Sequence, residues 1–362
     1  MKFLHLADLH IGKRLNGVNL IDDQKYIFNQ INGILKQNPV DAAVIAGDIY
    51  DKQAPSAEAT ELFDDFLTSL SKFNIPIMII SGNHDSPERL SFAGRILENN
   101  NIYIYSIFDG SLKCVTVKDV DFYLLPFVRP QTVRRFFPDE NFNTCDEMMK
   151  LILHNFKKHG KSVLVTHQFA VNGQADEQEV GTVINTDISI FKQFDYIALG
   201  HLHEPHRVSD NAVYAGSPLK YSLAEADYEK CALIIDTDNG ISIEKIPLVP
   251  LRDMRKIKGE LNNLISPDVY ETVNTDDFVY VTLTDSDEVT DAIGKLRKIY
   301  PNVMEIEFMN NHQKGDYSDI TVSDIESKTP FELFGDFFKK QNGYSMTSTQ
   351  EAIIKNLIEE KE

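Results

Sequence analysis

Residues able to bind a metal ion occur in short motifs, and each motif follows an apolar run. Together they offer carboxylate oxygen, amide oxygen and imidazole nitrogen. Such mixed sets suit manganese, iron or zinc, whereas sets of oxygen alone suit magnesium or calcium. The sequence therefore predicts a metal site with mixed ligands. The candidate ligands are Asp8, His10, Asp48, Asn83, His167, His201 and His203.

The spacing within the motifs allows neighbouring ligands to reach one cluster. In D-x-H and H-x-H the two ligands are separated by one residue, and such residues point to the same side of an extended segment. Glycines, which permit sharp turns and close backbone approach, precede three of the motifs, at Gly47, Gly82 and Gly200. Two divalent ions about 3.5 to 4 Å apart can activate water and clamp a phosphoryl group. The motifs therefore predict hydrolysis of a phosphate ester.

Each motif taken alone has a simpler explanation. The GNHD segment is also favourable turn composition, and GHLH could place two exposed histidines in a turn. Turn composition would seldom produce five such motifs in order at five predicted strand ends. The histidines outside the motifs are interpreted as ordinary core or surface residues: His5, His154, His159, His206 and His312.

Apolar runs and helical patterns alternate from the first residue to about residue 105, as in parallel sheets covered by helices. Ligands in such folds bind beyond the carboxyl ends of the strands, so motifs far apart in sequence would meet there. Helices are predicted over residues 22–37, after Ser56, and near residues 144–159. Shorter β runs after residue 203 predict a mixed or second sheet. The predicted strands that precede ligands are KFLHLAD, DAAVIAGD, IPIMIISGNHD, SVLVTHQ and YIALGHLHE.

The chain is long enough for one large domain and smaller units. We expect residues 1–250 to form the large domain and residues 251–312 a cap domain, with a helix over residues 287–299. Residues 329–362 carry two short helices with apolar faces. Such helices need a surface to pack on, which could be a partner protein or the cap domain.

Charge is the feature that fits nucleic acid least well. The formal net charge is -19, whereas affinity for nucleic acid comes largely from cations that neutralise phosphates. A local basic strip and scattered solubilising charges are both open explanations for Lys13, Arg14, Arg89, Arg129, Arg134 and Arg135. The three cysteines are far apart and form no CxxC pair, and no apolar run reaches the length of a membrane span. We expect a cytoplasmic protein without disulfides or zinc-thiolate sites.

The motif order D-x-H, GDxxD, GNHD, H and GHxH resembles that of the calcineurin-like metallophosphoesterase superfamily. The opening KFLHLADLHIGKRL and the overall layout resemble the SbcD family of bacterial nuclease subunits, over nearly the full chain. The resemblance implies an α/β fold, a four-layer α/β/β/α metallophosphoesterase sandwich with a small α+β cap domain and a C-terminal helix-loop-helix.

The resemblance also implies roles for the site residues. One metal would be held by Asp8, His10, Asp48 and His203, and the other by Asp48, Asn83, His167 and His201. His84 would stabilise the transition state or protonate the leaving 3' oxygen. Asp51 and Asp85 would orient histidines. Both ions would most often be Mn2+.

The implied function is that of a Mn-dependent DNA nuclease subunit in repair and recombination, with 3'-5' double-strand exonuclease and hairpin or single-strand endonuclease activity. It would act on DNA as a homodimer within a heterotetramer with the SMC-like ATPase SbcC. SbcC would bind the terminal helices and supply basic surface. Two alternatives are a same-fold phosphodiesterase acting on a small or cyclic nucleotide, and an inactive scaffold subunit. Scaffold subunits lose ligands, and this chain keeps all seven.

Overall fold

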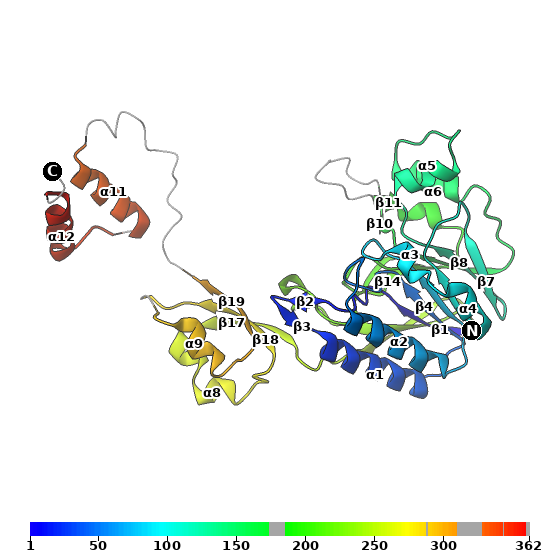
Figure 1. Cartoon of the computed structure of the whole chain (residues 1–362), viewed down its shortest axis with the longest axis horizontal. Helices are drawn as coiled ribbons and strands as arrows, with labels where there is room; N and C mark the ends of the chain where they lie inside the picture. The colour runs from blue at the N-terminus through cyan, green and yellow to red at the C-terminus, as the bar shows by residue number, and fades with distance from the viewer. Residues whose placement is uncertain (174–184, 287–288, 310–327, 343, 360–362) are drawn as a thin grey trace. The chain divides into compact units, whose positions relative to one another are not determined.

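The computed structural model describes residues 1–173, 185–286, 289–309, 328–342 and 344–359. The chain divides into two compact units, Met1–Arg255 and Lys256–Glu362. Figure 1 shows the whole chain coloured from the N-terminus to the C-terminus.

Two six-stranded sheets form the centre of the first unit. The order in the first sheet is β16 (Ser242–Pro247), β15 (Cys231–Asp236), β1 (Lys2–Leu6), β4 (Ala42–Ala46), β5 (Ile77–Ile80) and β6 (Ile102–Tyr105). The order in the second is β13 (His206–Ser209), β14 (Ala212–Tyr214), β12 (Tyr196–Leu199), β9 (Lys161–Thr166), β8 (Val120–Leu125) and β7 (Lys113–Val117). Five of these strands precede the ligand motifs: β1, β4 and β5 in the first sheet, and β9 and β12 in the second. Within each sheet these strands are neighbours and run parallel to one another.

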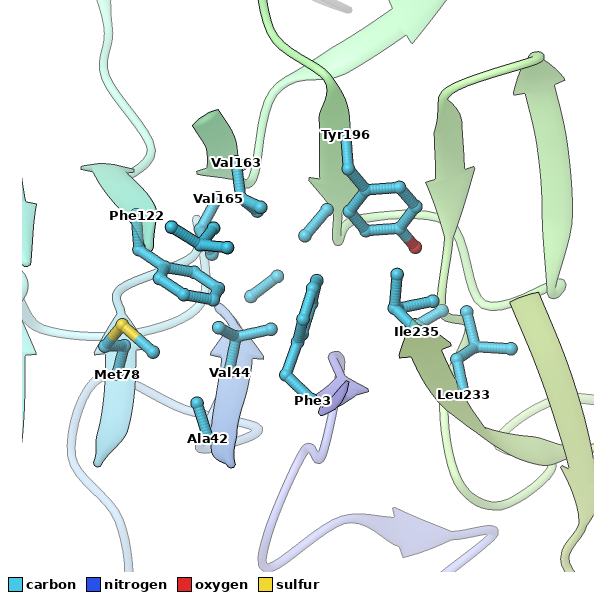
Figure 2. Packing of buried hydrophobic residues seen from close by; sticks show 14 of the residues in the cluster. Phe3, Ala42, Val44, Met78, Phe122, Val163, Val165, Tyr196, Leu233 and Ile235 are labelled. Carbon is cyan, nitrogen blue, oxygen red and sulfur yellow. The ribbon is translucent and has the colours of Figure 1, made fainter. Parts of the chain in front are cut away.

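The two sheets face each other across an apolar core. Phe3 of β1 packs edge-on against Phe122 of β8, with ring centroids 5.1 Å apart, and against Tyr196 of β12 at 5.7 Å. Figure 2 shows these rings among aliphatic side chains from both sheets, such as Val44 and Val165. This buried layer holds the two sets of strand ends in fixed relation.

Helices cover the outer faces of the sheets. On one side lie α1 (Ile21–Gln37) and α2 (Ala57–Ser71), and on the opposite side lie α5 (Pro130–Phe136) and α6 (Cys145–Ile152) (Figure 1). Ser56 caps α2 by accepting a hydrogen bond from the backbone of Ala59. The predicted four-layer α/β/β/α arrangement is therefore confirmed.

Short elements complete the first unit. They are β2 (Arg14–Leu15), β3 (Val18–Asn19), α3 (Pro87–Leu90), α4 (Gly94–Leu97), β10 (Phe169–Val171) and β11 (Asn185–Asp187), with three 3-10 turns over Glu98–Asn100, Ile188–Phe191 and Leu223–Glu225. None of the helices in the described ranges is long and apolar enough to cross a membrane.

The second unit contains a three-stranded sheet in the order β17 (Met254–Gly259), β18 (Phe278–Leu283) and β19 (Val303–Phe308). Three short helices accompany it, α7 (Leu261–Leu264), α8 (Pro267–Tyr270) and α9 (Ala292–Arg297). Its own core includes Val279, Val281, Leu296 and Tyr300. The terminal helices are α11 (Pro330–Asn342) and α12 (Ser348–Glu359). Thr329 directly precedes α11, and its hydroxyl and backbone amide contact the side chain of Glu332.

The extents of two predicted helices were wrong. The helix expected near residues 144–159 ends at Ile152, although Leu153 and Phe156 beyond its end still pack in the same core. The helix expected over residues 287–299 is confined to Ala292–Arg297, although residues 287–288 are outside the described ranges. Of the two alternatives for the β runs after residue 203, a mixed sheet is confirmed, because β15 pairs antiparallel with β1 in the sheet where β1 and β4 run parallel. The second sheet begins earlier, with β7 at Lys113.

Candidate metal centre

The loops that follow five strands meet at one place in the first unit. His167, after β9 of the second sheet, donates from Nδ1 to the carbonyl oxygen of Ala46 in β4 of the first sheet, at 2.7 Å. Asn83, after β5, places Oδ1 3.1 Å from Nε2 of His167 and 3.0 Å from Nδ1 of His201. The structure thus brings ligand motifs from both sheets together.

The backbone of these loops is unusual. Asp8, His10, Asp48 and His201 all have positive φ angles, of 53°, 42°, 49° and 103°. Such angles are costly for residues other than glycine, and they cluster at functional sites where surrounding contacts hold them. Here the backbone amide of His10 donates to the carbonyl oxygen of Asp48 at 3.0 Å. The loops are therefore held in a strained form by contacts between the motifs.

Two glycines allow the loops to approach so closely. A Cβ atom on Gly200 would lie 1.9 Å from the carbonyl oxygen of Ala46, and one on Gly82 would lie 2.1 Å from Oδ1 of Asp48. Both distances are far below van der Waals contact, and the neighbours are fixed parts of the site. Glycine is therefore required at both positions, as the sequence indicated.

Two overlapping groups of side chains could each hold a cation. In one group, ligand atoms of Asp8, His10 and His203 lie within 4.8 Å of one another, and in the other those of Asp8, Asp48 and His167 do so. Oδ2 of Asp48 lies 3.5 Å from Nε2 of His10 and 3.3 Å from Nε2 of His167. Asp48 therefore lies between the two groups, where a bridging ligand would be.

The charge state of the cluster fits divalent cations. Burial raises the pKa of Asp8, whereas for Asp48 the nearby imidazoles of His167 and His10 outweigh burial and lower the pKa. Burial lowers the pKa of His167, but the carboxylate of Asp48 outweighs this and raises it to about 9. The buried carboxylates thus recruit a proton onto an imidazole. A divalent cation can take the place of that proton, because ligands bind metals in their deprotonated forms.

His84 lies beside this cluster and is exposed to solvent. Its Nδ1 lies 3.1 Å from the carbonyl oxygen of Asp51, and its ring centroid is 4.8 Å from that of His10. His84 also forms a third group of possible ligands with His10 and Asp48.

Of the two aspartates expected to orient histidines, one has a different role. Asp85 accepts hydrogen bonds from the backbone amides of Ile49, Tyr50 and Gly82, and so fastens two ligand loops together. The expectation for Asp85 was wrong because sequence does not reveal which backbone amides a buried carboxylate will meet. Oδ1 of Asp51 lies 3.8 Å from Nδ1 of His10 and 2.8 Å from Nζ of Lys13, with which it forms an ion pair.

Sequence reasoning missed Glu225, whose carboxylate accepts a hydrogen bond from Nδ1 of His203 at 2.9 Å. The segment SLAEADYEK contains no histidine or glycine motif that would single it out. The signal is only a buried acidic residue near a buried lysine, which becomes visible once the chain is folded.

The remaining candidates do not join the cluster. His5 is buried between the sheets, His154 and His159 follow the end of α6, His206 is exposed on β13, and His312 lies outside the described residues. The basic residues thought to form a strip are partly engaged elsewhere: Lys13 pairs with Asp51, and the guanidinium of Arg134 lies 4.8 Å from the ring centroid of Phe142.

Comparison with known proteins agrees with this geometry. Residues 1–205 match the family model described as calcineurin-like phosphoesterase, and residues 250–342 match SbcD_C, described as type 5 capsule protein repressor C-terminal domain. The chain is 32% identical over 373 residues to the SbcD subunit of the nuclease SbcCD from Staphylococcus epidermidis, a match that covers 99% of this chain and 98% of that protein.

Two solved structures match more distantly. They are TT1561 of Thermus thermophilus, 10% identical, and a dimetal phosphatase from Danio rerio, 12% identical, each with a TM-score of 0.41. The matches cover 68% and 69% of this chain and 99% of each of the other chains. At this similarity they carry no argument about the site. The motifs, the four-layer fold and the full-length match together place the chain in the calcineurin-like phosphoesterase family, as a homologue of the nuclease subunit SbcD.

Proposed function

We propose that this chain is a Mn-dependent DNA nuclease that cuts phosphodiester bonds as a 3'-5' double-strand exonuclease and a hairpin or single-strand endonuclease. The observation that carries the proposal is the convergence of two carboxylates, one amide and four imidazoles from five strand ends in one largely buried cluster. The ligands would be Asp8, His10, Asp48 and His203 for one ion, and Asp48, Asn83, His167 and His201 for the other.

A pair of divalent ions supplies Lewis acidity and a water nucleophile at neutral pH. The chain's own residues do the positioning. Asp8 accepts the backbone amide of His201 at 3.0 Å, which ties the first ligand loop to the last. Asp48 accepts the backbone amide of His84 at 2.8 Å, which ties the bridging carboxylate to the loop that faces the substrate. Rigid loops of this kind keep reacting groups aligned.

His84 is suited to act on the phosphate rather than to hold an ion. Its Nδ1 can donate to the carbonyl oxygen of Asp51, and the residue is exposed to solvent beside the cluster. We assign to it stabilisation of the transition state or transfer of a proton to the leaving 3' oxygen.

The terminal helices are proposed to bind the ATPase SbcC. The two helices pack on each other only in part: Nζ of Lys355 lies 5.5 Å from the ring centroid of Phe331, while Phe337, Ile353 and Leu357 are each more than half exposed. Helices this short are marginal alone in water. An amphipathic pair with exposed apolar residues fits a groove on a helical partner, and residues 329–362 are assigned to that contact.

The segment after the GNHD motif is proposed as the surface that makes the homodimer. Phe92 is 83% exposed and Ile96 is 68% exposed, both on or between the short helices α3 and α4. These two large apolar side chains lie four residues apart in sequence, and a contiguous apolar patch there would suit an interaction site. A dimer bound to two SbcC subunits would be a heterotetramer that acts in the cytoplasm on DNA.

Cleavage of end-labelled duplex and hairpin DNA by the purified chain with Mn2+ tests the activity. Asp48→Ala should abolish cleavage, whereas the control Asp65→Ala, on the exposed face of α2, should not. A small chromogenic phosphodiester is assayed in parallel. Cleavage of the small ester but not of DNA, with or without added SbcC, would replace the nuclease with a phosphodiesterase of small or cyclic nucleotides.

A further inference from the structure

We propose that Glu225 and Lys230 are positioning residues for the metal centre, which fix the ring and the backbone of His203 so that Nε2 of this imidazole faces the cation. The inference rests on the proposed function, since it assigns a task at the same site. Neither residue is among the side chains that could contact an ion within the described groups. Both would act only through His203.

The ring of His203 is held from behind by Glu225. Oε1 of Glu225 lies 2.9 Å from Nδ1 of His203 and 3.1 Å from the hydroxyl oxygen of Ser222. An ionised carboxylate has no proton to give, so Nδ1 of the imidazole must be the donor. The tautomer is thereby fixed, and the lone pair on Nε2 points toward the cluster, where Nε2 of His10 lies 3.0 Å away.

Lys230 holds the same histidine through its backbone. Nζ of Lys230 donates to the carbonyl oxygen of His203 at 2.8 Å, to the hydroxyl of Ser217 at 2.8 Å and to Oε2 of Glu225 at 2.6 Å. The ammonium group has three protons, and each has an acceptor. The ring and the carbonyl of His203 are therefore attached to one buried ion pair.

The burial of this pair argues that it has a specific task. Glu225 is 4% exposed and Lys230 is 6% exposed. Removing two charges from water is expensive, and such pairs often contribute little net stability compared with apolar residues of similar size. A histidine that binds a metal usually donates its other nitrogen to a carboxylate or carbonyl, which orients the ring and raises its basicity. His167 has such a partner in the carbonyl of Ala46, and Glu225 is the equivalent for His203.

The lysine also holds the carboxylate in place. Nζ of Lys230 donates to Oε2 of Glu225 while Oε1 accepts from Nδ1 of His203, so each carboxylate oxygen has its own donor. Without Lys230, Glu225 would be a buried charge without its counterion. The two residues therefore act as a unit, and loss of either should weaken the same ion.

The test is Mn2+ titration by calorimetry of the full chain after treatment with chelator, with Glu225→Gln and Lys230→Met compared with the wild type. Each variant should lose about 10- to 100-fold in affinity for one of two ions and keep its affinity for the other. The control is Glu229→Gln, which changes a carboxylate outside the ion pair in the same segment and should leave both affinities unchanged. Melting temperatures in chelator report whether each variant is folded.

A second measurement is made on the wild type itself. Nitrogen-15 NMR of the imidazoles in the metal-free wild type, assigned with His203→Gln, should show the proton of His203 on Nδ1. A proton on Nε2, or two unchanged Mn2+ affinities in a folded Glu225→Gln chain, would overturn the inference and leave the nuclease proposal intact. A wild type that binds no Mn2+ would instead overturn the proposed function, and the inference with it.

Discussion

Buried His5 should make the stability of the first unit depend on pH in a measurable way. Its imidazole is fully buried between the sheets, 3.1 Å from the hydroxyl of Tyr196. Burial lowers its pKa from 6.5 to about 3, although a backbone carbonyl at Leu199 opposes the shift. Because the folded pKa is below the unfolded one, the unfolded chain binds the extra proton as the pH falls from 6.5 toward 3. Stability is therefore lost on acidification.

The size of the effect follows from the two pKa values. Between pH 7.5 and pH 5, protonation of His5 stabilises the unfolded chain relative to the folded chain by about 2 kcal/mol, at about 1.36 kcal/mol per unit of pKa. The variant His5→Leu removes the group that titrates. It also leaves the Tyr196 hydroxyl without this partner, but that loss is the same at both pH values and cancels when slopes are compared.

Urea unfolding of the chelator-treated chain at pH 7.5 and pH 5 measures the difference. Over this interval the free energy of unfolding of the wild type should fall by about 2 kcal/mol more than that of His5→Leu. The control His206→Gln replaces an exposed histidine of β13 and is unfolded under the same conditions. Parallel curves for wild type and His5→Leu would refute the reasoning.

Four further outcomes are expected. His84→Gln should bind two Mn2+ ions by calorimetry yet lose about 100- to 10,000-fold in the rate of single-turnover DNA cleavage; loss of an ion would instead make His84 a ligand. Phe3→Ala, which removes the ring contacts with Phe122 and Tyr196, should lower the free energy of unfolding in urea by about 3 to 5 kcal/mol. A change under about 1 kcal/mol would mean that neighbouring side chains move to fill the cavity. Dialysis against chelator should abolish cleavage, with Mn2+ restoring it and Ca2+ failing to do so, because imidazole ligands suit the former. Phe92→Glu should convert a dimer to a monomer in sedimentation velocity, and an unchanged dimer would move the interface elsewhere.

Much of the fold could be predicted because local patterns decide it. The apolar runs before each ligand motif form strands where the sequence indicated, and the helix beginning after Ser56 starts there because its hydroxyl caps the first turn. The sheet to which each strand belongs could not be predicted. β15 pairs antiparallel with β1, far away in the sequence, through backbone hydrogen bonds that carry no sequence signature.

The site shows the same division between local and distant information. Its candidate ligands were recognisable because residue type and a spacing of two place each pair at one loop. The residues that hold these loops were not, because Asp85 meets amides from Ile49 and Tyr50, and Glu225 meets His203, only after folding. A buried carboxylate in a sequence does not reveal its donor. The strained φ angles at Asp8 and Asp48 likewise appear only in the folded loops.

The acidic character of the chain has a consequence for how DNA would be held. With 55 acidic and 36 basic side chains, the first contact with DNA is opposed by the field of the protein as a whole. Bound divalent ions would reverse the sign of the potential only close to Asp8 and Asp48, and Lys13, the lysine nearest to Asp8 in sequence, is already paired with Asp51. The chain alone should therefore bind DNA weakly, with a shallow dependence on salt. A basic partner that docks on the exposed faces of α11 and α12, as proposed above, would supply both the affinity and the steeper salt dependence.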